Sequence, residues 1–139
     1  MSFVAIGFGL ALACLAGWCL NRRAGVLREL PAGAPSDDAG SDAEYLGLEP
    51  GRPAVVHFSA PWCGPCAGLR RVVDQVCAEL GDVAHKEIDI DDDPAAARRF
   101  SVLSLPTTLI FDTEGAQRFR AAGVPAAADL RSALKPLLA

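Results

Sequence analysis

The sequence predicts an α/β domain whose central mixed sheet of four to five strands is flanked by helices on both faces and preceded by an N-terminal transmembrane helix. Three observations predict this arrangement. The first twenty residues form an uncharged apolar run, the later part of the chain alternates β-branched segments with amphipathic ones, and Gly and Pro residues separate these segments. The 139 residues are enough for one domain with an appendage.

The N-terminal segment, residues 2–20, contains no charged side chain and is long enough to cross a hydrocarbon core of about 30 Å as a helix. A cleaved signal peptide is the alternative, but no Lys or Arg precedes the run, which is longer than a typical signal-peptide core. We therefore expect residues 1–23 to be a membrane anchor. Because Arg22, Arg23 and Arg28 follow the run, the positive-inside rule predicts a single-pass protein with its N-terminus outside and its domain in the cytoplasm.

Residues 24–41 are rich in Ala, Gly, Pro, Ser and Asp, a composition typical of a flexible linker. Within it, residues 25–30 could add a short edge strand. The pattern becomes globular from residue 42, so we predict a single domain over residues 42–139. This domain is expected to begin with a short helix at residues 42–48.

The centre of the domain combines a strand, a long helix and a second strand. Residues 54–60 are apolar and β-branched, which favours a strand. Apolar residues then recur at helical spacing from Cys66 to Leu80, and Gly81 is suited to end that helix. Residues 83–90 alternate in polarity and predict the second strand.

The C-terminal part begins with a short helix, in which Asp93 is the N-cap and Pro94 the first helical residue, running to about Phe100. Four further elements follow, namely a strand at residues 107–111, a hairpin turn at 112–115, a strand at 116–121 and a closing helix at 126–135. Pro136 should end the last helix. The order β-α-β-α-β-β-α allows the helices to cover both faces of the sheet.

The composition argues against several functional classes. A net charge of −4 without a basic stripe argues against a nucleic-acid partner. Five scattered cysteines do not suit a disulfide scaffold, and two histidines beside one CxxC are too few for a structural zinc site. We therefore predict no metal site and no bound cofactor.

Cys63 and Cys66 lie where the first predicted strand passes into the long helix. Cysteines three residues apart in the first helical turn bring their sulfur atoms within bonding distance. The first thiol meets the positive end of the helix dipole and free backbone N–H groups, which lower its pKa and make it nucleophilic. Cys66 lies on the apolar face of the helix, so we expect it to be more buried and to react second.

One five-residue segment of this chain reads Trp62-Cys63-Gly64-Pro65-Cys66. This segment resembles the active site of the thioredoxin family. The cis-proline loop of the same family resembles a later segment, Leu105-Pro106-Thr107. Gly123 also resembles a family glycine near the substrate groove, and the similarity covers about residues 50–139. The resemblance implies a thioredoxin fold, protein disulfides as substrates, and a redox-active Cys63–Cys66 disulfide in place of a cofactor.

The resemblance also implies roles for individual residues. Cys63 would attack a substrate disulfide, and Cys66 would resolve the mixed disulfide. The substrate-binding surface would consist of residues from the turn and the proline loop, namely Trp62, Gly64, Pro65, Leu105, Pro106 and Gly123. The peptide group of Leu105 would pair with an extended substrate strand.

Two polar positions depart from the thioredoxin pattern. Where the family carries a buried Asp and a neighbouring Lys, this chain has His57 and Glu87. One interpretation is a reversed pair, in which Glu87, held by His57, accepts the proton of Cys66. The alternative is that His57 satisfies a backbone group or that Glu87 points to solvent. His85 is expected on the solvent side of its strand.

The leading hypothesis is a monomeric, membrane-tethered protein-disulfide reductase that receives electrons from a thioredoxin reductase-type donor. One alternative is an extracytoplasmic reductase for cytochrome maturation or envelope protein thiols, although such proteins usually carry an insert before the cis-proline. Another alternative is a non-catalytic adaptor of a membrane complex. The intact CxxC favours an enzyme. The Gly-Pro pair between the cysteines resembles that of reducing members of the family, which implies the reducing direction.

Overall fold

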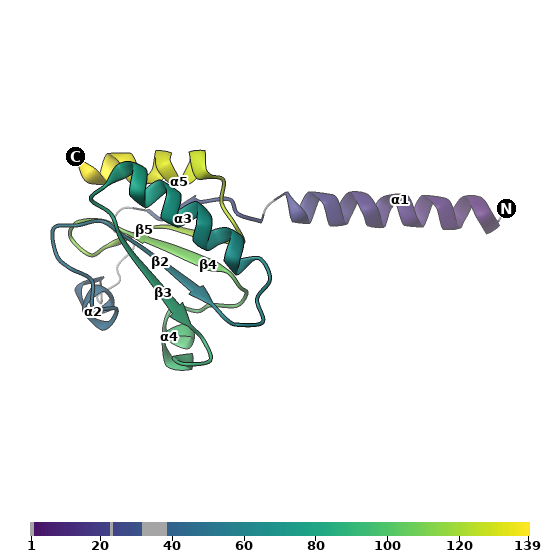
Figure 1. Cartoon of the computed structure of the whole chain (residues 1–139). Helices are drawn as coiled ribbons and strands as arrows, with labels where there is room; N and C mark the ends of the chain where they lie inside the picture. Colours follow the sequence, from purple (N-terminus) through teal and green to yellow (C-terminus); the bar gives the residue numbers. More distant parts are fainter. Residues whose placement is uncertain (1, 23, 32–38) are drawn as a thin grey trace.

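The computed structural model describes residues 2–22, 24–31 and 39–139. Its elements follow the order α1-β1-α2-β2-α3-β3-α4-β4-β5-α5, with a closing 3-10 helix η1 (Figure 1). The predicted end of the anchor at residue 23 and the middle part of the predicted linker, residues 32–38, lie outside the described residues.

A five-stranded mixed sheet forms the centre of the domain, with the strand order β1-β5-β4-β2-β3. The strands are β1 (Arg28–Glu29), β2 (Ala54–Ser59), β3 (Ala84–Asp89), β4 (Thr107–Phe111) and β5 (Gln117–Ala122). Strands β2 and β3 are parallel, and the other neighbours are antiparallel. The predicted mixed sheet is confirmed, and the linker supplies β1 as its edge strand.

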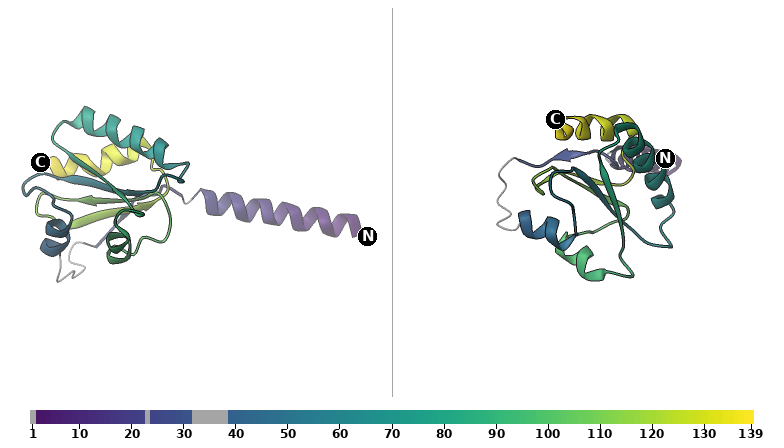
Figure 2. Two further views of the ribbon diagram at one scale, coloured as in Figure 1. Left: turned by 60° about the horizontal axis from the view of Figure 1, so that its bottom comes forward. Right: turned by 60° about the vertical axis from the view of Figure 1, so that its left-hand side comes forward.

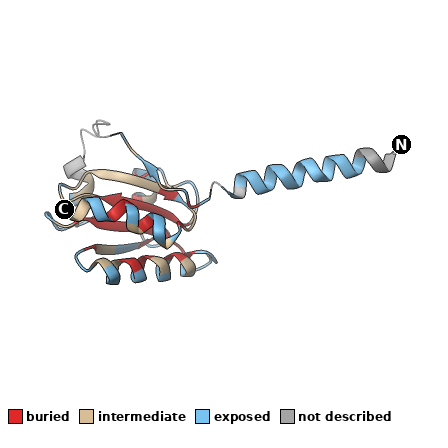
Figure 3. Ribbon diagram, turned by 90° about the horizontal axis from the view of Figure 1, so that it is seen from above, coloured by how far each residue is buried: buried red, intermediate tan, exposed pale blue. Residues whose placement is uncertain are grey.

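Helices cover both faces of this sheet (Figures 1 and 2). The helices of the domain are α2 (Ala39–Tyr45), α3 (Cys66–Leu80), α4 (Pro94–Arg99) and α5 (Ala127–Leu134). On the face covered by α3 and α5, Val55, Leu69 and Leu130 belong to one buried hydrophobic cluster. Burial is concentrated in the sheet and on the helix sides that face it (Figure 3).

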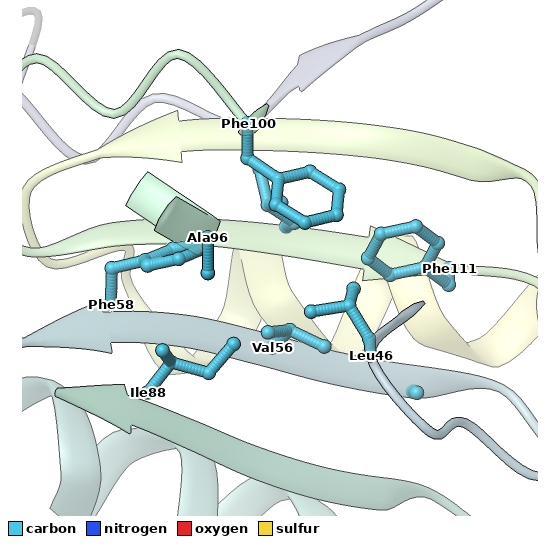
Figure 4. Packing of buried hydrophobic residues seen from close by; sticks show 9 residues of the cluster. Leu46, Val56, Phe58, Ile88, Ala96, Phe100 and Phe111 are labelled. Carbon is cyan, nitrogen blue, oxygen red and sulfur yellow. The ribbon is translucent and has the colours of Figure 1, made fainter. Parts of the chain in front are cut away.

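A second hydrophobic cluster fills the other face, beside α2 and α4 (Figure 4). Val56 and Phe58 point to this side, whereas Val55 points toward α3, because successive strand residues alternate between the two faces. The rings of Phe100 and Phe111 meet edge to face with their centroids 6.5 Å apart. The two clusters hold the strands in register and thereby fix the ends of the strands where the site lies.

Helix α2 lies earlier in the chain than the predicted residues 42–48, because backbone hydrogen bonds close it after Tyr45. The N–H of Gly47 donates to the Glu44 carbonyl, and the N–H of Leu48 donates to the Ala43 carbonyl. Gly47 also has a φ of 64°, a conformation that commonly ends a helix.

The C-terminal end also differs from the prediction. Helix α5 ends at Leu134, but the chain continues as the 3-10 helix η1 (Lys135–Leu138). Pro136 falls in the first turn of η1, where its missing N–H needs no partner, so it does not stop the helical path.

Helix α1 (Ser2–Asn21) corresponds to the predicted N-terminal helix and extends away from the domain (Figures 1 and 3). Its described side chains, from Ile6 to Leu20, are all exposed. Within the described parts of the chain, no helix combines the length and the apolar character that crossing a membrane requires. The helix is therefore confirmed, but its predicted transmembrane role is not supported.

Candidate active site

Cys63 and Cys66 form a disulfide at the junction of β2 and α3, with an S–S distance of 2.07 Å. The N–H of Cys63 donates to the Ala60 carbonyl at 3.1 Å, which fixes the turn that follows β2. Cys66 begins α3, and Pro65 precedes it with helical φ and ψ angles and without a side-chain cap. The first N–H groups of α3 and the positive end of its dipole are therefore directed toward this turn.

The two cysteines differ in exposure. Cys66 is only 2% exposed and shares the apolar side of α3 with Leu69, whereas Cys63 is half-buried at the surface. The neighbouring side chain of Trp62 is 68% exposed. An incoming disulfide can therefore contact Cys63 from solvent, while Cys66 reaches Cys63 from inside the protein.

The predicted substrate-binding residues gather at one end of the sheet. Thr107 of β4 pairs with both Phe58 of β2 and Ala122 of β5. The end of β2, the start of β4 and the end of β5 are therefore adjacent. These ends carry the dithiol turn, Pro106 and Gly123 respectively.

The Leu105–Pro106 peptide bond is cis, as expected. The carbonyl of Pro106 accepts a hydrogen bond from the N–H of Gly123 at 2.8 Å. Gly123 has a φ of 89°, and a Cβ at this position would lie 3.0 Å from the backbone nitrogen of Gly25. Gly123 thus supports the proline loop in a conformation that favours glycine.

The loop before Pro106 is also held by β5. The guanidinium of Arg120 donates to the carbonyls of Phe100 and Ser101 at 2.8 and 2.7 Å. In the middle of the loop, Leu103 is 95% exposed. The sequence alone gave no signal for this use of Arg120, because it depends on the pairing of distant segments.

A polar network lies between the sheet and α3. His57 is completely buried, and its Nδ1 lies 3.0 Å from Nε2 of His85. Nδ1 of His85 in turn lies 3.0 Å from a carboxylate oxygen of Asp74 on α3. Nε2 of His57 lies 3.6 Å from Glu87, which is longer than a hydrogen bond.

Glu87 is held mainly by two other side chains. It accepts a hydrogen bond from the hydroxyl of Ser59 at 2.7 Å and two from the guanidinium of Arg70. These contacts, chiefly that with Arg70, lower the pKa of Glu87 from 4.5 to about 2. The predicted pair of His57 and Glu87 is thus brought together, and its role in proton transfer stays a prediction.

Burial controls the charge of His57. Desolvation lowers its pKa from 6.5 to about 4, because the imidazolium is disfavoured away from water. The negative charge of Glu87 acts in the opposite direction but does not offset burial. His57 is therefore a neutral ring at pH 7.

The sequence-based prediction missed three members of this network, namely Arg70, Asp74 and His85. It placed His85 on the solvent side, but the ring faces α3 and contacts Asp74. Strand alternation would have found it, because residues 85 and 87 project to the same side of β3. Arg70 and Asp74 are likewise four residues apart on one face of a helix.

The reactive atoms at this end of the sheet are the two sulfur atoms of the disulfide. A cysteine pair of this kind exchanges two electrons with an external dithiol or disulfide, and the exchange itself involves only sulfur atoms and protons. Across the described residues, no group of three or more His, Cys, Asp or Glu side chains could hold a metal ion.

Comparison with protein families supports this assignment of chemistry. Residues 47–136 match the family model described as Thioredoxin. A thioredoxin from Mycolicibacterium smegmatis is 39% identical over 108 residues, which cover 76% of this chain and 93% of that protein. Chloroplastic thioredoxin M5 from Oryza sativa subsp. japonica is 36% identical over 77 residues, which cover 55% of this chain but only 44% of the plant protein.

Comparison with solved structures gives the same result for the fold. The thioredoxin of Fasciola hepatica superposes with a TM-score of 0.58 and 27% sequence identity. The superposition covers 73% of this chain and 93% of that structure. The superposition thus supports a thioredoxin fold for the domain.

Proposed function

This chain belongs to the thioredoxin family, and from that membership we propose that it is a reductase of protein disulfides. Thioredoxins are thiol–disulfide oxidoreductases, so the Cys63–Cys66 pair is the redox centre of the chain. One observation carries the proposed order of events, namely that Cys63 reaches the surface while Cys66 is buried behind it.

The reaction begins from the reduced dithiol. The thiolate of Cys63 attacks one sulfur atom of the substrate disulfide, the substrate S–S bond breaks, and the first substrate thiolate leaves. The thiol of Cys66 then loses its proton, and its sulfur attacks the sulfur of Cys63. This second step releases the other substrate thiolate and leaves the Cys63–Cys66 disulfide seen in the structure. Two electrons pass from the protein to the substrate.

The disulfide has to be reduced again before another cycle. Membership of the family implies an external reductase as the electron donor, and we expect a thioredoxin reductase-type enzyme. The Gly64–Pro65 dipeptide between the cysteines resembles that of reducing members of the family, which supports the reducing direction.

The substrate is expected to bind as an extended strand beside the dithiol. The peptide group of Leu105, with the cis bond of Pro106 after it, would pair with the backbone of that strand. Gly123 and the exposed ring of Trp62 would line the remainder of the surface. Adjacent strand ends bring these residues to the same end of the sheet as the dithiol.

Reduction of insulin disulfides by the chain, with dithiothreitol as the electron source, tests the proposal. The wild-type chain should accelerate insulin precipitation, and Cys63→Ser should abolish the acceleration. Cys66→Ser should instead accumulate a mixed disulfide with the substrate, which mass spectrometry would detect. If the reduced wild-type chain leaves insulin intact, the reductase proposal is wrong and a non-catalytic adaptor role becomes the better explanation.

We also propose that the apolar N-terminal helix attaches the domain to a membrane. The described side chains of α1 are exposed apolar groups, and residues 2–20 carry no charge. Arg22, Arg23 and Arg28 follow the helix, which favours the cytoplasmic side for the domain. An extracytoplasmic domain acting on cytochrome-maturation partners or envelope thiols is the alternative.

Fractionation and labelling of intact cells would test this attachment. The full chain should remain in the membrane fraction after alkaline extraction, whereas a chain lacking residues 1–23 should be released. A membrane-impermeant thiol reagent should leave Cys63 unlabelled in intact cells and label it after lysis. Extraction of the full chain at high pH would contradict the attachment, and labelling of intact cells would contradict the cytoplasmic side.

A further inference from the structure

Arg120 of β5 binds the segment that leads from α4 to the cis-proline. Its guanidinium donates one hydrogen bond to the Phe100 carbonyl at 2.8 Å and another to the Ser101 carbonyl at 2.7 Å. These two carbonyls come directly after α4, so a positive charge lies at the C-terminal end of that helix, where it is favourable. We call this double contact the arginine clamp.

The clamp fixes the direction in which the chain leaves α4. The ring of Phe100 lies in the buried cluster of Figure 4 and anchors the start of the loop. Ser101 follows with a φ of 50°, a left-handed conformation that is unfavourable for a residue with a Cβ atom. Apolar packing has no preferred direction, whereas two hydrogen bonds from one planar guanidinium set both the position and the angle of this turn.

Strand β5 holds the loop at its other end as well. Four residues separate Ser101 from Pro106, whose carbonyl accepts a hydrogen bond from the N–H of Gly123 at 2.8 Å. Arg120 and Gly123 thus hold the two ends of one short segment from neighbouring positions of the chain. That segment contains Leu105, whose peptide group is expected to pair with an extended substrate strand.

We propose that Arg120 is a positioning residue that sets the preference of the chain for protein disulfides over small disulfides. This inference deepens the proposed reductase function and rests on it. Arg120 acts through the loop and not on the sulfur atoms, because it holds the peptide group of Leu105 where a substrate strand can pair with it. A disulfide that is flanked by peptide groups gains from this arrangement, whereas one without peptide groups does not.

The two hydrogen bonds also explain why a guanidinium is placed inside the fold. Arg120 is partly buried, and this burial lowers its pKa because the charged form is disfavoured away from water. A planar guanidinium has several fixed donors and can bind two adjacent carbonyls at once, whereas an ammonium is a single point charge. Lysine at this position should therefore keep only part of the clamp.

Two disulfides in different surroundings test the proposal. Insulin presents its disulfides between peptide strands, whereas hydroxyethyl disulfide contains no peptide group. The reduced full chain would be mixed with an excess of either compound and the reaction stopped by acid after a series of short times. Alkylation, digestion and mass spectrometry then give the fraction of chains in which Cys63 and Cys66 have become oxidised. The dependence of the rate on insulin concentration gives a half-saturating concentration and a limiting rate.

Removal of the clamp should weaken only the recognition of insulin. In Arg120→Met, a loop that holds the pairing arrangement for about a tenth of the time would raise the half-saturating insulin concentration about tenfold. The limiting rate for insulin and the rate constant for hydroxyethyl disulfide should stay within about twofold of the wild type. Arg120→Lys should raise the half-saturating concentration only about threefold, because an ammonium still donates to one carbonyl.

Arg118→Met is the matched control. Arg118 lies two residues earlier in β5 and on the same face of the sheet. Its guanidinium lies 3.3 Å from the carboxylate of Asp112, beside the hairpin turn. The control removes the same kind of side chain from the same strand without altering the clamp. The half-saturating insulin concentration of Arg118→Met should therefore equal that of the wild type.

Hydrogen exchange reports the loop directly. The N–H groups of Ser101 and Val102 donate to carbonyls of α4, so their exchange rates measure how often this turn opens. Both should exchange faster in Arg120→Met than in the wild type, while the amides of β2 and β4 should be unchanged. Circular dichroism checks that each variant is folded, and Arg120→Lys provides the test if Arg120→Met does not fold.

The outcomes separate this inference from the proposed function. An unchanged half-saturating insulin concentration in Arg120→Met, or an equal loss with both disulfides, would overturn the positioning role while leaving the reductase proposal intact. Failure of the reduced wild-type chain to reduce insulin would contradict the reductase proposal itself, and with it the inference that rests on it.

Discussion

Acidification should lower the free energy of unfolding through His57. The pKa of this ring is lowered from 6.5 to about 4 in the folded protein because burial disfavours its charged form. Between these two values the unfolded chain binds a proton that the folded chain does not. Stability therefore falls as the pH falls through this window, and the loss is complete once the pH is below about 4.

The size of the effect follows from the same interval. One pKa unit corresponds to about 1.4 kcal/mol, so the window from 6.5 to about 4 amounts to a loss of about 3 kcal/mol. That is a large share of the roughly 5–15 kcal/mol that stabilises a typical domain. Glu87 contributes to the pH dependence of stability in a lower pH range. Arg70 lowers the pKa of Glu87 from 4.5 to about 2, so the stability that Glu87 contributes is lost only as the pH falls from 4.5 to about 2.

Urea denaturation of the oxidised chain, followed by circular dichroism from pH 7.5 to pH 4, measures this dependence. The wild type and the surface control Glu79→Gln should lose stability together over the window. His57→Gln should be less stable at pH 7, because it disturbs a buried hydrogen bond, but should lack the His57 component of the slope. Equal stability of the wild type at pH 6.5 and pH 4, or an unchanged slope in His57→Gln, would refute this account of the buried ring.

Three further substitutions or reactions test other parts of the structure. Phe111→Ala should lower the free energy of unfolding by about 3–5 kcal/mol in urea denaturation, because the ring is buried in the cluster of Figure 4. Asp93→Ala should cost about 1 kcal/mol in the same assay, because its carboxylate caps α4, whereas Asp92→Ala should cost far less. Alkylation of the reduced chain at pH 8 should label Cys63 well before Cys77, because burial raises the pKa of Cys77 to about 11; equal labelling rates would contradict that difference.

The sequence was sufficient to predict the elements around the dithiol. These elements follow from local patterns, namely the apolar run of β2, the helical spacing of apolar residues in α3, and Gly81 at the C-terminal end of α3. The structure confirms the bounds of each element within about a residue. Local sequence patterns predicted the ends of α2 and α5 less reliably, because backbone geometry determines where these two helices end. Gly47 closes α2 early through its own backbone hydrogen bond, and Pro136 is accommodated in a 3-10 turn, so neither end followed from side-chain periodicity.

The polar network between the sheet and α3 was only partly predictable, because it depends on how distant segments pair. The register that places His57 beside Glu87 also places Val55 beside His85, and no local pattern specifies it. Matching residue positions to the thioredoxin pattern was enough to predict that His57 and Glu87 lie close together. The contact of α3 with that pair, through Arg70, required the helix to be docked on the sheet.

The proline loop is attached to β5 near both of its ends. Arg120 fixes one end of the loop and Gly123 fixes the other, so the shape of the loop does not depend on the side chain at its exposed tip. Because Leu103 is 95% exposed, we expect that a charged or aromatic group at this position would leave the sulfur atoms and the buried histidines undisturbed. A library of variants at this single position should therefore share one reactive centre, and their activities on different protein disulfides would measure whether this exposed tip influences the choice of partner.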